Sequence, residues 1–203
     1  MVARQKVKIP IRALLRPRGG DFLYSDIEYE VMKRDIDMAK KIGVDGIVFG
    51  ILQADGQIDI ARCREIINEA RPLPATFHRA FDMTADPFHA LEDIAALGCD
   101  RILTSGQERD ALTGSPLLAE LVKRAGDRIT IMPGAGINDV NCAHIIALTG
   151  AAMLHLTGQR ITESAMLFRN PKVTMGSVGM PEYSISATDV DRIRRIRKIV
   201  DEM

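Results

Sequence analysis

The sequence contains no tryptophan, and its aromatic residues amount to only 4%. Proteins that hold single-stranded nucleic acid stack the bases on aromatic side chains, so this scarcity argues against such a platform. The chain also has no net charge, because 27 lysine and arginine residues balance 27 aspartate and glutamate residues. No overall field attracts nucleic acid or an anionic membrane, and any affinity for anions must be local. We therefore expect neither nucleic acid nor a membrane as a partner.

Cysteine is also scarce. The three cysteines, Cys63, Cys99 and Cys142, lie far apart and form no C-x-x-C pair. This pattern indicates reduced thiols in a cytoplasmic protein and no disulfide framework. No apolar run approaches the ~20 residues that a membrane-spanning helix needs. The 46% hydrophobic content is enough for one sizeable core, which predicts a single domain over residues 1–203.

Short apolar runs alternate with helical segments along the chain, and capping residues mark where the helices begin. Strands are expected at residues 7–15, 46–52, 74–77, 101–104, 128–132 and 151–156. The expected helix starts are the capping box of Ser25 and Glu28, then Asp59, Asp86 before Pro87, Ser115 before Pro116, Asn138, and the pair Thr188 and Asp189. Residues 157–186 are expected to be irregular. The alternation predicts a parallel sheet with right-handed crossovers.

Two architectures share this pattern, a doubly wound open sheet and a TIM-like (β/α)₈ barrel. No G-x-G-x-x-G sequence opens the first helix, so the best sign of a dinucleotide-binding fold is missing. Polar residues follow the strand ends, as in barrel enzymes, yet a barrel usually has eight strands and ~250 residues. About six β-α units therefore predict an incomplete, TIM-barrel-like α/β fold. Its first strand, at residues 7–15, would lie at an open edge and favour homo-oligomers.

Residues 16–22, RPRGGDF, follow the first predicted strand and contain two arginines beside a diglycine. Arginine recognises carboxylate or phosphate groups in a bidentate manner, and paired glycines let backbone approach a ligand closely. Arg16 and Arg18 are therefore candidate anion-binding residues. The structural alternative is a sharp turn whose arginines pair with surface acids.

Residues 76–82, TFHRAFD, follow the third predicted strand. Here His78 is a candidate general acid or base, Asp82 a group that orients it, and Arg79 a group that steadies an anion. The alternative is a buried histidine satisfied by backbone, with Arg79 and Asp82 paired across a turn. Ser105 follows the fourth strand without a G-x-S-x-G elbow, so we do not expect it to be a nucleophile.

Glycine-containing loops follow the last two predicted strands. Gly134 and Gly136 precede a helix N-terminus, where converging N–H groups favour an anion, and Thr157 follows the sixth strand. Because strand ends converge on one rim of a parallel β/α fold, we expect these residues and the arginines to line one concave face.

Four segments together carry a resemblance to a known family: residues 16–22, 76–82, 103–106 (LTSG) and 132–137 (MPGAGI). They resemble the CutC family of copper homeostasis proteins over nearly the whole chain. The resemblance implies a barrel-like β/α fold, a cytoplasmic location, self-association and copper handling, with Cu(I) binding suggested for some members. It brings no established reaction with it.

The resemblance also implies two further β-α units ahead of the segment that matches residues 9–10, and this chain is expected to lack them. In the family, the cysteines proposed as copper ligands belong to those units. The three cysteines present here are better explained as buried structural residues, and the methionines are scattered. Cu(I) prefers soft sulfur ligands, so a copper cofactor is doubtful in this chain and its metal ligands are unknown.

Three functions stay open at this stage. The chain is a copper-binding or copper-buffering protein, an enzyme or binding protein for a small anionic (phosphorylated) metabolite, or a structural remnant without activity. Arginine, glycine and histidine at strand ends suit an anion better than Cu(I), whereas the family resemblance favours copper.

Overall fold

The computed structural model describes residues 2–173 and 182–202. Its body is a five-stranded parallel sheet with the strand order β1-β2-β3-β4-β5. The strands are β1 (Arg12–Leu14), β2 (Gly46–Phe49), β3 (Ala75–Phe77), β4 (Arg101–Thr104) and β5 (Thr130–Pro133). Within the described residues the sheet does not close on itself. The predicted α/β, TIM-barrel-like and incomplete fold is therefore confirmed.

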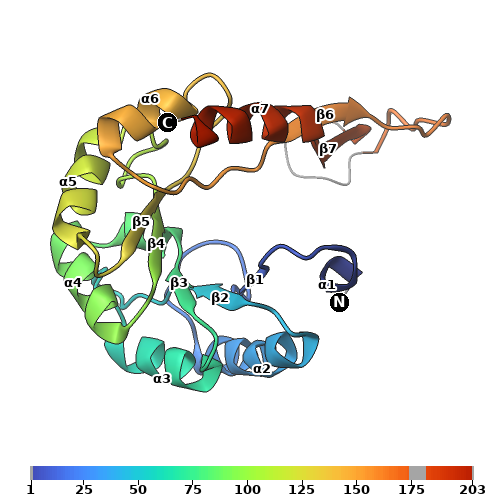
Figure 1. The fold of residues 1–203 in the computed structure, drawn as a ribbon. Helices are drawn as coiled ribbons and strands as arrows, with labels where there is room; N and C mark the ends of the chain where they lie inside the picture. Colours follow the sequence, from blue (N-terminus) through green and yellow to red (C-terminus); the bar gives the residue numbers. More distant parts are fainter. Residues whose placement is uncertain (1, 174–181, 203) are drawn as a thin grey trace.

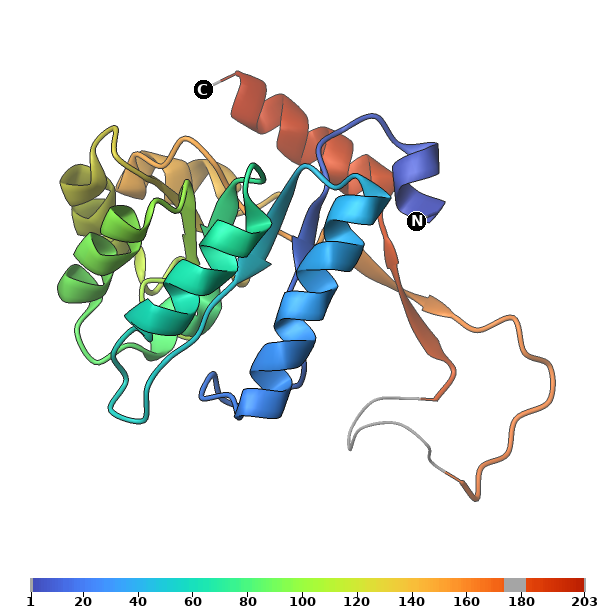
Figure 2. The ribbon, with the colours of Figure 1, turned by 90° about the horizontal axis from the view of Figure 1, so that it is seen from below.

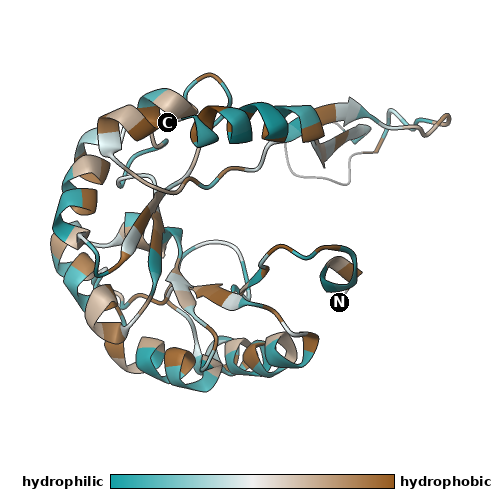
Figure 3. Ribbon diagram, viewed as in Figure 1, coloured by the Kyte–Doolittle hydropathy of each residue, from teal (hydrophilic) through white to brown (hydrophobic). Residues whose placement is uncertain are grey.

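Helices connect the strands and form an arc around the outside of the sheet (Figure 1). They are α2 (Asp26–Ile42), α3 (Ile60–Ala70), α4 (Pro87–Leu97), α5 (Ser115–Ala125), α6 (Cys142–Thr149) and the short 3₁₀ helix η1 (Arg79–Met83). Most of these helices carry both hydrophobic and hydrophilic stripes in Figure 3. The hydrophobic side chains bury against the sheet, where Phe49 and Phe77 pack edge to face with ring centroids 5.7 Å apart. No described helix is long and apolar enough to cross a membrane.

Most of the predicted helix starts are confirmed. Ser25 and Glu28 form both bonds of the capping box at α2, and Asp86 caps α4 through the N–H groups of Phe88 and His89. The prediction for α6 is wrong. The Oδ1 atom of Asn138 accepts hydrogen bonds from two backbone N–H groups in a turn, and the helix begins four residues later at Cys142. An asparagine can satisfy nearby N–H groups in a turn as well as at a cap, and here it does the former.

Two strand predictions need correction. The expected strand at residues 7–15 shortens to Arg12–Leu14, and the segment ahead of it contains helix α1 (Val2–Lys6). Arg4 holds this helix to the body by an ion pair with Asp45 at 2.6 Å. Residues 151–156 form no strand, although the N–H of His155 donates to the carbonyl of Pro133 at 2.8 Å. That single bond places this segment beside β5 without continuing the sheet.

The expectation of irregular structure over residues 157–186 is wrong in part. An antiparallel hairpin joins β6 (Gln159–Glu163) to β7 (Ser184–Thr188), and it extends away from the parallel sheet (Figure 2). Helix α7 (Val190–Asp201) follows and lies beside α6 (Figure 1). It is held there by buried Ile196 and by an ion pair of Arg195 with Asp139 at 2.9 Å.

Edge strand β1 is tied to the sheet by a side chain as well as by backbone. Arg12 reaches past its neighbour β2 and donates to the hydroxyl of Thr76 at 2.6 Å and to Asp100 at 2.7 Å. Gly46 lies beneath this path, and a Cβ atom there would be 3.1 Å from the Cγ atom of Arg12. A glycine at this position therefore lets the arginine bridge from the first strand to the third.

Candidate functional site

Backbone hydrogen bonds continue one residue past the ends of several strands and gather functional residues at one rim. The N–H of His78 donates to the carbonyl of Phe49 at 2.7 Å, and that of Gly134 donates to Thr104 at 2.9 Å. These bonds place the segments after β3 and β5 at the carboxyl edge of the sheet, where parallel β/α proteins build their sites.

Arg16, after β1, has a guanidinium that is held by neutral groups. It donates to the carbonyl of Gly20 at 2.8 Å, and its Cζ atom lies 4.7 Å from the centroid of the Phe22 ring. Among the residues that the structure describes, no carboxylate forms an ion pair with Arg16. These contacts hold the guanidinium in place. Because the side chain is exposed, its charge is available to an incoming anion.

Arg18 behaves differently, although it lies only two residues away. Its Nε atom donates to Glu28 at 2.5 Å, and a terminal nitrogen donates to Asp21 at 2.8 Å. The hydrogen bond from Arg18 holds the pKa of Asp21 below its usual range, and the backbone N–H of Ser25 followed by Arg18 does the same for Glu28. Arg18 therefore braces the loop against the start of α2, and its charge is compensated by two carboxylates.

His78 is almost completely buried at the end of β3. Its Nδ1 atom accepts a hydrogen bond from the N–H of Ala80 at 3.1 Å, so the neutral ring carries its proton on Nε2. That Nε2 atom is buried and has no hydrogen-bond partner. Burial, followed by the positive charge of Arg16, lowers the pKa of His78 to about 4. At neutral pH the residue is an uncharged imidazole with one unused donor.

Asp82 has other partners than the expected histidine. Its carboxylate accepts from Arg79 at 2.7 Å, from the N–H and hydroxyl of Ser105, and from the hydroxyl of Thr104 and the N–H of Gln107. Arg79 also donates to the Ser105 hydroxyl at 2.9 Å. Asp82 therefore joins η1 to the loop after β4 and orients Arg79, while the Ala80 N–H orients His78.

A cavity of about 280 Å³ gathers three of the predicted residues. It is lined by Arg79, Ala135, Gly136, Ile137, His155, Leu156 and Thr157. Burial and the charge of Arg79 lower the pKa of His155, which favours a neutral ring. Both Ala135 and Gly136 have positive φ, 82° and 71°, so the loop after β5 is wound in the left-handed region. Backbone, hydroxyl and guanidinium groups thus meet in one small volume.

Two glycines make room for the histidines. A Cβ atom at Gly50 would lie 2.5 Å from Nδ1 of His78. A Cβ atom at Gly134 would lie 2.5 Å from Leu103 and 3.4 Å from Nδ1 of His155. The Gly134 position therefore serves close packing beside the cavity. Its N–H donates to the carbonyl of Thr104, and helix α6 begins only at Cys142.

The predicted set thus falls into separate groups. Arg16 lies near His78, with the Phe22 ring close to both, since the Phe22 and His78 centroids are 5.0 Å apart. Arg79, Gly136 and Thr157 share the smaller cavity with His155. Sequence reasoning missed Phe22 and His155 as site residues. Their signal in the sequence was weak, because each residue stands next to more conspicuous ones. A phenylalanine or a histidine at such a position is also ordinary in a protein core.

The thiols do not fit a soft-metal site. Cys63, Cys99 and Cys142 are all buried, and burial raises the pKa of Cys99 to about 12 and that of Cys63 well above its usual range. The Sγ atom of Cys63 instead contacts the carbonyl of Ile51 at 3.7 Å. Within the described ranges, no three histidine, cysteine or acidic side chains gather as metal ligands. A Cu(I) ion needs accessible thiolate or thioether donors, and these cysteines do not offer them.

Comparison with known proteins gives a consistent result. The model of the CutC family matches residues 1–160. The chain is 48% identical to the copper homeostasis protein cutC homolog of Mus musculus, covering 100% of this chain and 75% of the mouse protein. It is 49% identical to the Homo sapiens homolog over 98% of this chain and 73% of that protein.

A solved structure also matches. The crystal structure of a CutC protein from Streptococcus agalactiae superposes with a TM-score of 0.72 at 32% identity, covering 76% of this chain and 75% of that one. The sequence identity, the family match and the shared fold agree, and the chain belongs to the CutC family of copper homeostasis proteins.

Proposed function

We propose that this chain binds a small anionic ligand at the carboxyl ends of its strands. One observation carries the proposal: the Arg16 guanidinium, without an acidic partner among the described residues, packs on the Phe22 ring beside His78, whose Nε2 atom is buried and has no hydrogen-bond partner. A buried donor without a partner is costly, and an unpaired cation beside it favours an anion with acceptor oxygens. A phosphate or carboxylate supplies both the charge and the acceptors.

His78 acts in this proposal as a neutral donor. With a pKa of about 4 it is a weak base at neutral pH, and its Nε2–H is suited to donating a hydrogen bond to an oxyanion. Arg79, Gly136 and Thr157 supply a second group of donors in the neighbouring cavity. Each charge-assisted hydrogen bond contributes ~1.5–3 kcal/mol, so two or three hold a small anion. We assign no reaction to the site.

The test uses inorganic phosphate and isothermal titration calorimetry. Wild-type protein is expected to bind phosphate, and Arg16→Gln is expected to weaken the binding at least about tenfold, the loss of one charge-assisted bond. Arg64→Gln is the matched control, because Arg64 is an exposed arginine on α3, away from the strand ends. Phosphate binding that is absent, or equal in Arg16→Gln and wild type, would contradict the proposal.

A second function comes from the relatives, which are named copper homeostasis proteins. We propose that this chain also serves copper homeostasis, in the cytoplasm, and that it does so without a thiolate Cu(I) site of its own. The buried cysteines with raised pKa values support the latter point. Competition with a Cu(I) chelator measures it: the protein is expected to take no Cu(I) from the chelator. Stoichiometric binding that Cys63→Ser or Cys142→Ser abolishes would show the ligands to have been misjudged.

A further inference from the structure

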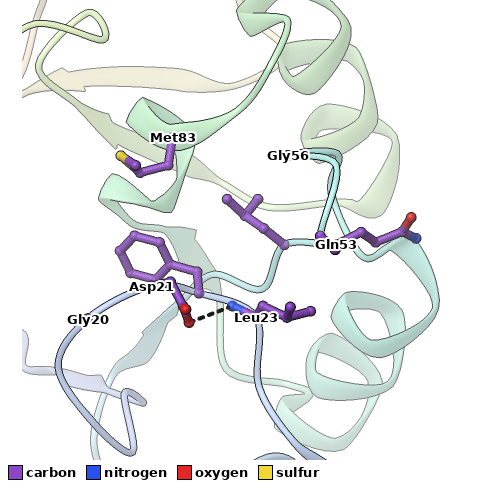
Figure 4. A pocket seen from close by; sticks show the side chains of 9 residues that line it. Gly20, Asp21, Leu23, Gln53, Gly56 and Met83 are labelled. Atoms are coloured by element: carbon purple, nitrogen blue, oxygen red, sulfur yellow. Dashed lines mark hydrogen bonds between the residues drawn. The ribbon is translucent and has the colours of Figure 1, made fainter.

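A larger pocket lies next to Arg16, and none of the predicted site residues lines it. It has a volume of about 420 Å³ and is lined by Gly20, Asp21, Phe22, Leu23, Leu52, Gln53, Ala54, Gly56 and Met83 (Figure 4). This volume is in the range of small-molecule sites. In Figure 4, Met83 at the end of η1 lies across from the segment that carries Asp21 and Leu23.

The walls of this pocket are fixed by backbone hydrogen bonds between three loops. The N–H of Leu52 donates to the carbonyl of Phe22 at 2.9 Å, which joins the loop after β2 to the loop after β1. The N–H of Ala85 donates to the carbonyl of Gly56 at 3.1 Å, which joins the loop after η1 to the same wall. The pocket is thus formed before any ligand binds. A ligand therefore loses little binding free energy to the ordering of these loops.

Apolar side chains dominate the pocket. Phe22, Leu23, Leu52 and Met83 supply its side walls, and Met83 and Leu23 are 66% and 49% exposed. Its carboxylate, Asp21, is already paired with Arg18 and also accepts the N–H of Leu23 at 3.2 Å. A ligand group in this pocket therefore meets mainly hydrophobic surface. The negative charge of Asp21, the acidic residue of the lining, is compensated by Arg18.

Two lining residues connect the pocket to Arg16. Its guanidinium donates to the carbonyl of Gly20 at 2.8 Å and lies 4.7 Å from the Phe22 ring centroid. The Phe22 ring is also the aromatic neighbour of His78. A single side chain, Phe22, thus borders the apolar pocket and contacts both Arg16 and His78.

From this arrangement we infer that the ligand is an anion carrying an apolar group, such as an aryl or branched-alkyl phosphate. Its anionic end meets Arg16, and its apolar end fills the pocket between Phe22, Leu52 and Met83. The inference rests on the proposed function and narrows its ligand class. Free inorganic phosphate leaves the hydrophobic walls uncovered and forgoes the free energy of their burial.

The experiment compares inorganic phosphate with phenyl phosphate in calorimetric titrations of the full chain. Phenyl phosphate is expected to bind at least about tenfold more tightly, the gain from burying a phenyl ring. Arg16→Gln should weaken both ligands. The double variant Leu23→Asn/Met83→Gln should reduce the affinity for phenyl phosphate to within about threefold of the affinity for inorganic phosphate. The affinity for inorganic phosphate should stay at the wild-type value. Met38→Gln, which alters an exposed methionine on α2, is the control.

The outcomes separate the two ideas. Equal affinity for the two ligands, with both lost in Arg16→Gln, overturns the apolar pocket and leaves the anion site standing. Phenyl phosphate that binds Arg16→Gln as tightly as wild type overturns both the anion site and the apolar pocket. A protein that binds neither ligand also overturns both. Circular dichroism melting of the double variant confirms its fold, and Leu23→Asn alone repeats the test if the double variant melts early.

Discussion

Arg16 and Arg18 are separated by one proline and have opposite surroundings: Arg18 is bound to two carboxylates, while Arg16 lies against an aromatic ring without an acidic partner among the described residues. The two arginines therefore divide the work of their loop. Arg18 holds the loop to α2, and Arg16 presents charge at the strand ends. The same tripeptide thus contains a structural cation and a candidate binding cation.

This division predicts different outcomes for two alanine variants. Arg18→Ala removes both ion pairs and is expected to lower the free energy of unfolding while leaving phosphate binding within a few-fold of wild type. Arg16→Ala is expected to leave unfolding nearly unchanged and to abolish phosphate-dependent stabilisation. Urea denaturation with and without phosphate measures both quantities. A reversal of the two phenotypes would mean that Arg18 is the ligand-binding residue.

The buried His78 predicts a pH dependence of stability. Its pKa falls from 6.5 to about 4 on folding, so the unfolded chain binds more protons between these values. The contribution of neutral His78 is complete above pH 6.5 and is lost as the pH falls toward 4, by up to about 3 kcal/mol. Urea denaturation across this range should show a steeper loss for wild type than for His78→Gln.

His89, an exposed histidine on α4, provides the control for that experiment. His89→Gln measures how much replacing an exposed histidine changes stability by itself. If His78→Gln and wild type lose stability in parallel, the histidine is charged in the folded protein and is not the neutral donor proposed here.

Gly50 predicts a steric effect. Gly50→Ala would place a methyl group 2.5 Å from Nδ1 of His78, and the resulting overpacking is expected to cost about 1–3 kcal/mol of unfolding free energy. Adding His78→Ala should recover part of this loss, because the colliding ring is removed. Gly19→Ala is a suitable control, since a Cβ atom at Gly19 meets nothing within 4 Å. Equal losses for Gly19→Ala and Gly50→Ala would rule out the steric explanation.

The open edge of the sheet predicts self-association. Strand β1 lies at the end of the strand order, and its Leu14 is 60% exposed. Exposed strand edges pair with other chains unless charge blocks them. Size-exclusion chromatography with light scattering is expected to find dimers or larger species, and Leu14→Lys should shift them toward monomers. Val140→Lys, at a 90% exposed position ahead of α6, should not. A wild-type protein that is monomeric at all concentrations contradicts the prediction.

Sequence reasoning predicted the features that depend on local chemistry. The helix start at Asp86 followed directly from a capping side chain next to a proline. The strand expected at residues 151–156 failed for a different reason. An apolar run reports that a segment is buried, whereas a strand also needs a continuous hydrogen-bonded neighbour, and this segment has the single bond from His155.

The candidate site was predictable in its location and less so in its contacts. Strand ends converge in every parallel β/α fold, so the rim itself followed from the pattern. The pair of Arg79 and Asp82 was among the alternatives that the spacing offered. The other three partners of Asp82 lie 22 to 25 residues further along the chain, and the difference between Arg16 and Arg18 depends on the position of Glu28 in space. Such contacts are set by tertiary packing, which spacing in the sequence does not encode.

The reach of Arg12 across β2 has a consequence for hydrogen exchange. A three-residue edge strand would ordinarily fray first, and its amides would exchange with solvent faster than those of the central strands. Here the Arg12 side chain is bonded to Thr76 on β3 and to Asp100 just ahead of β4, so separating β1 from the sheet also breaks these side-chain bonds. The amides of β1 should therefore exchange more slowly than those of an edge strand held by backbone bonds alone, and Arg12→Ala should speed their exchange.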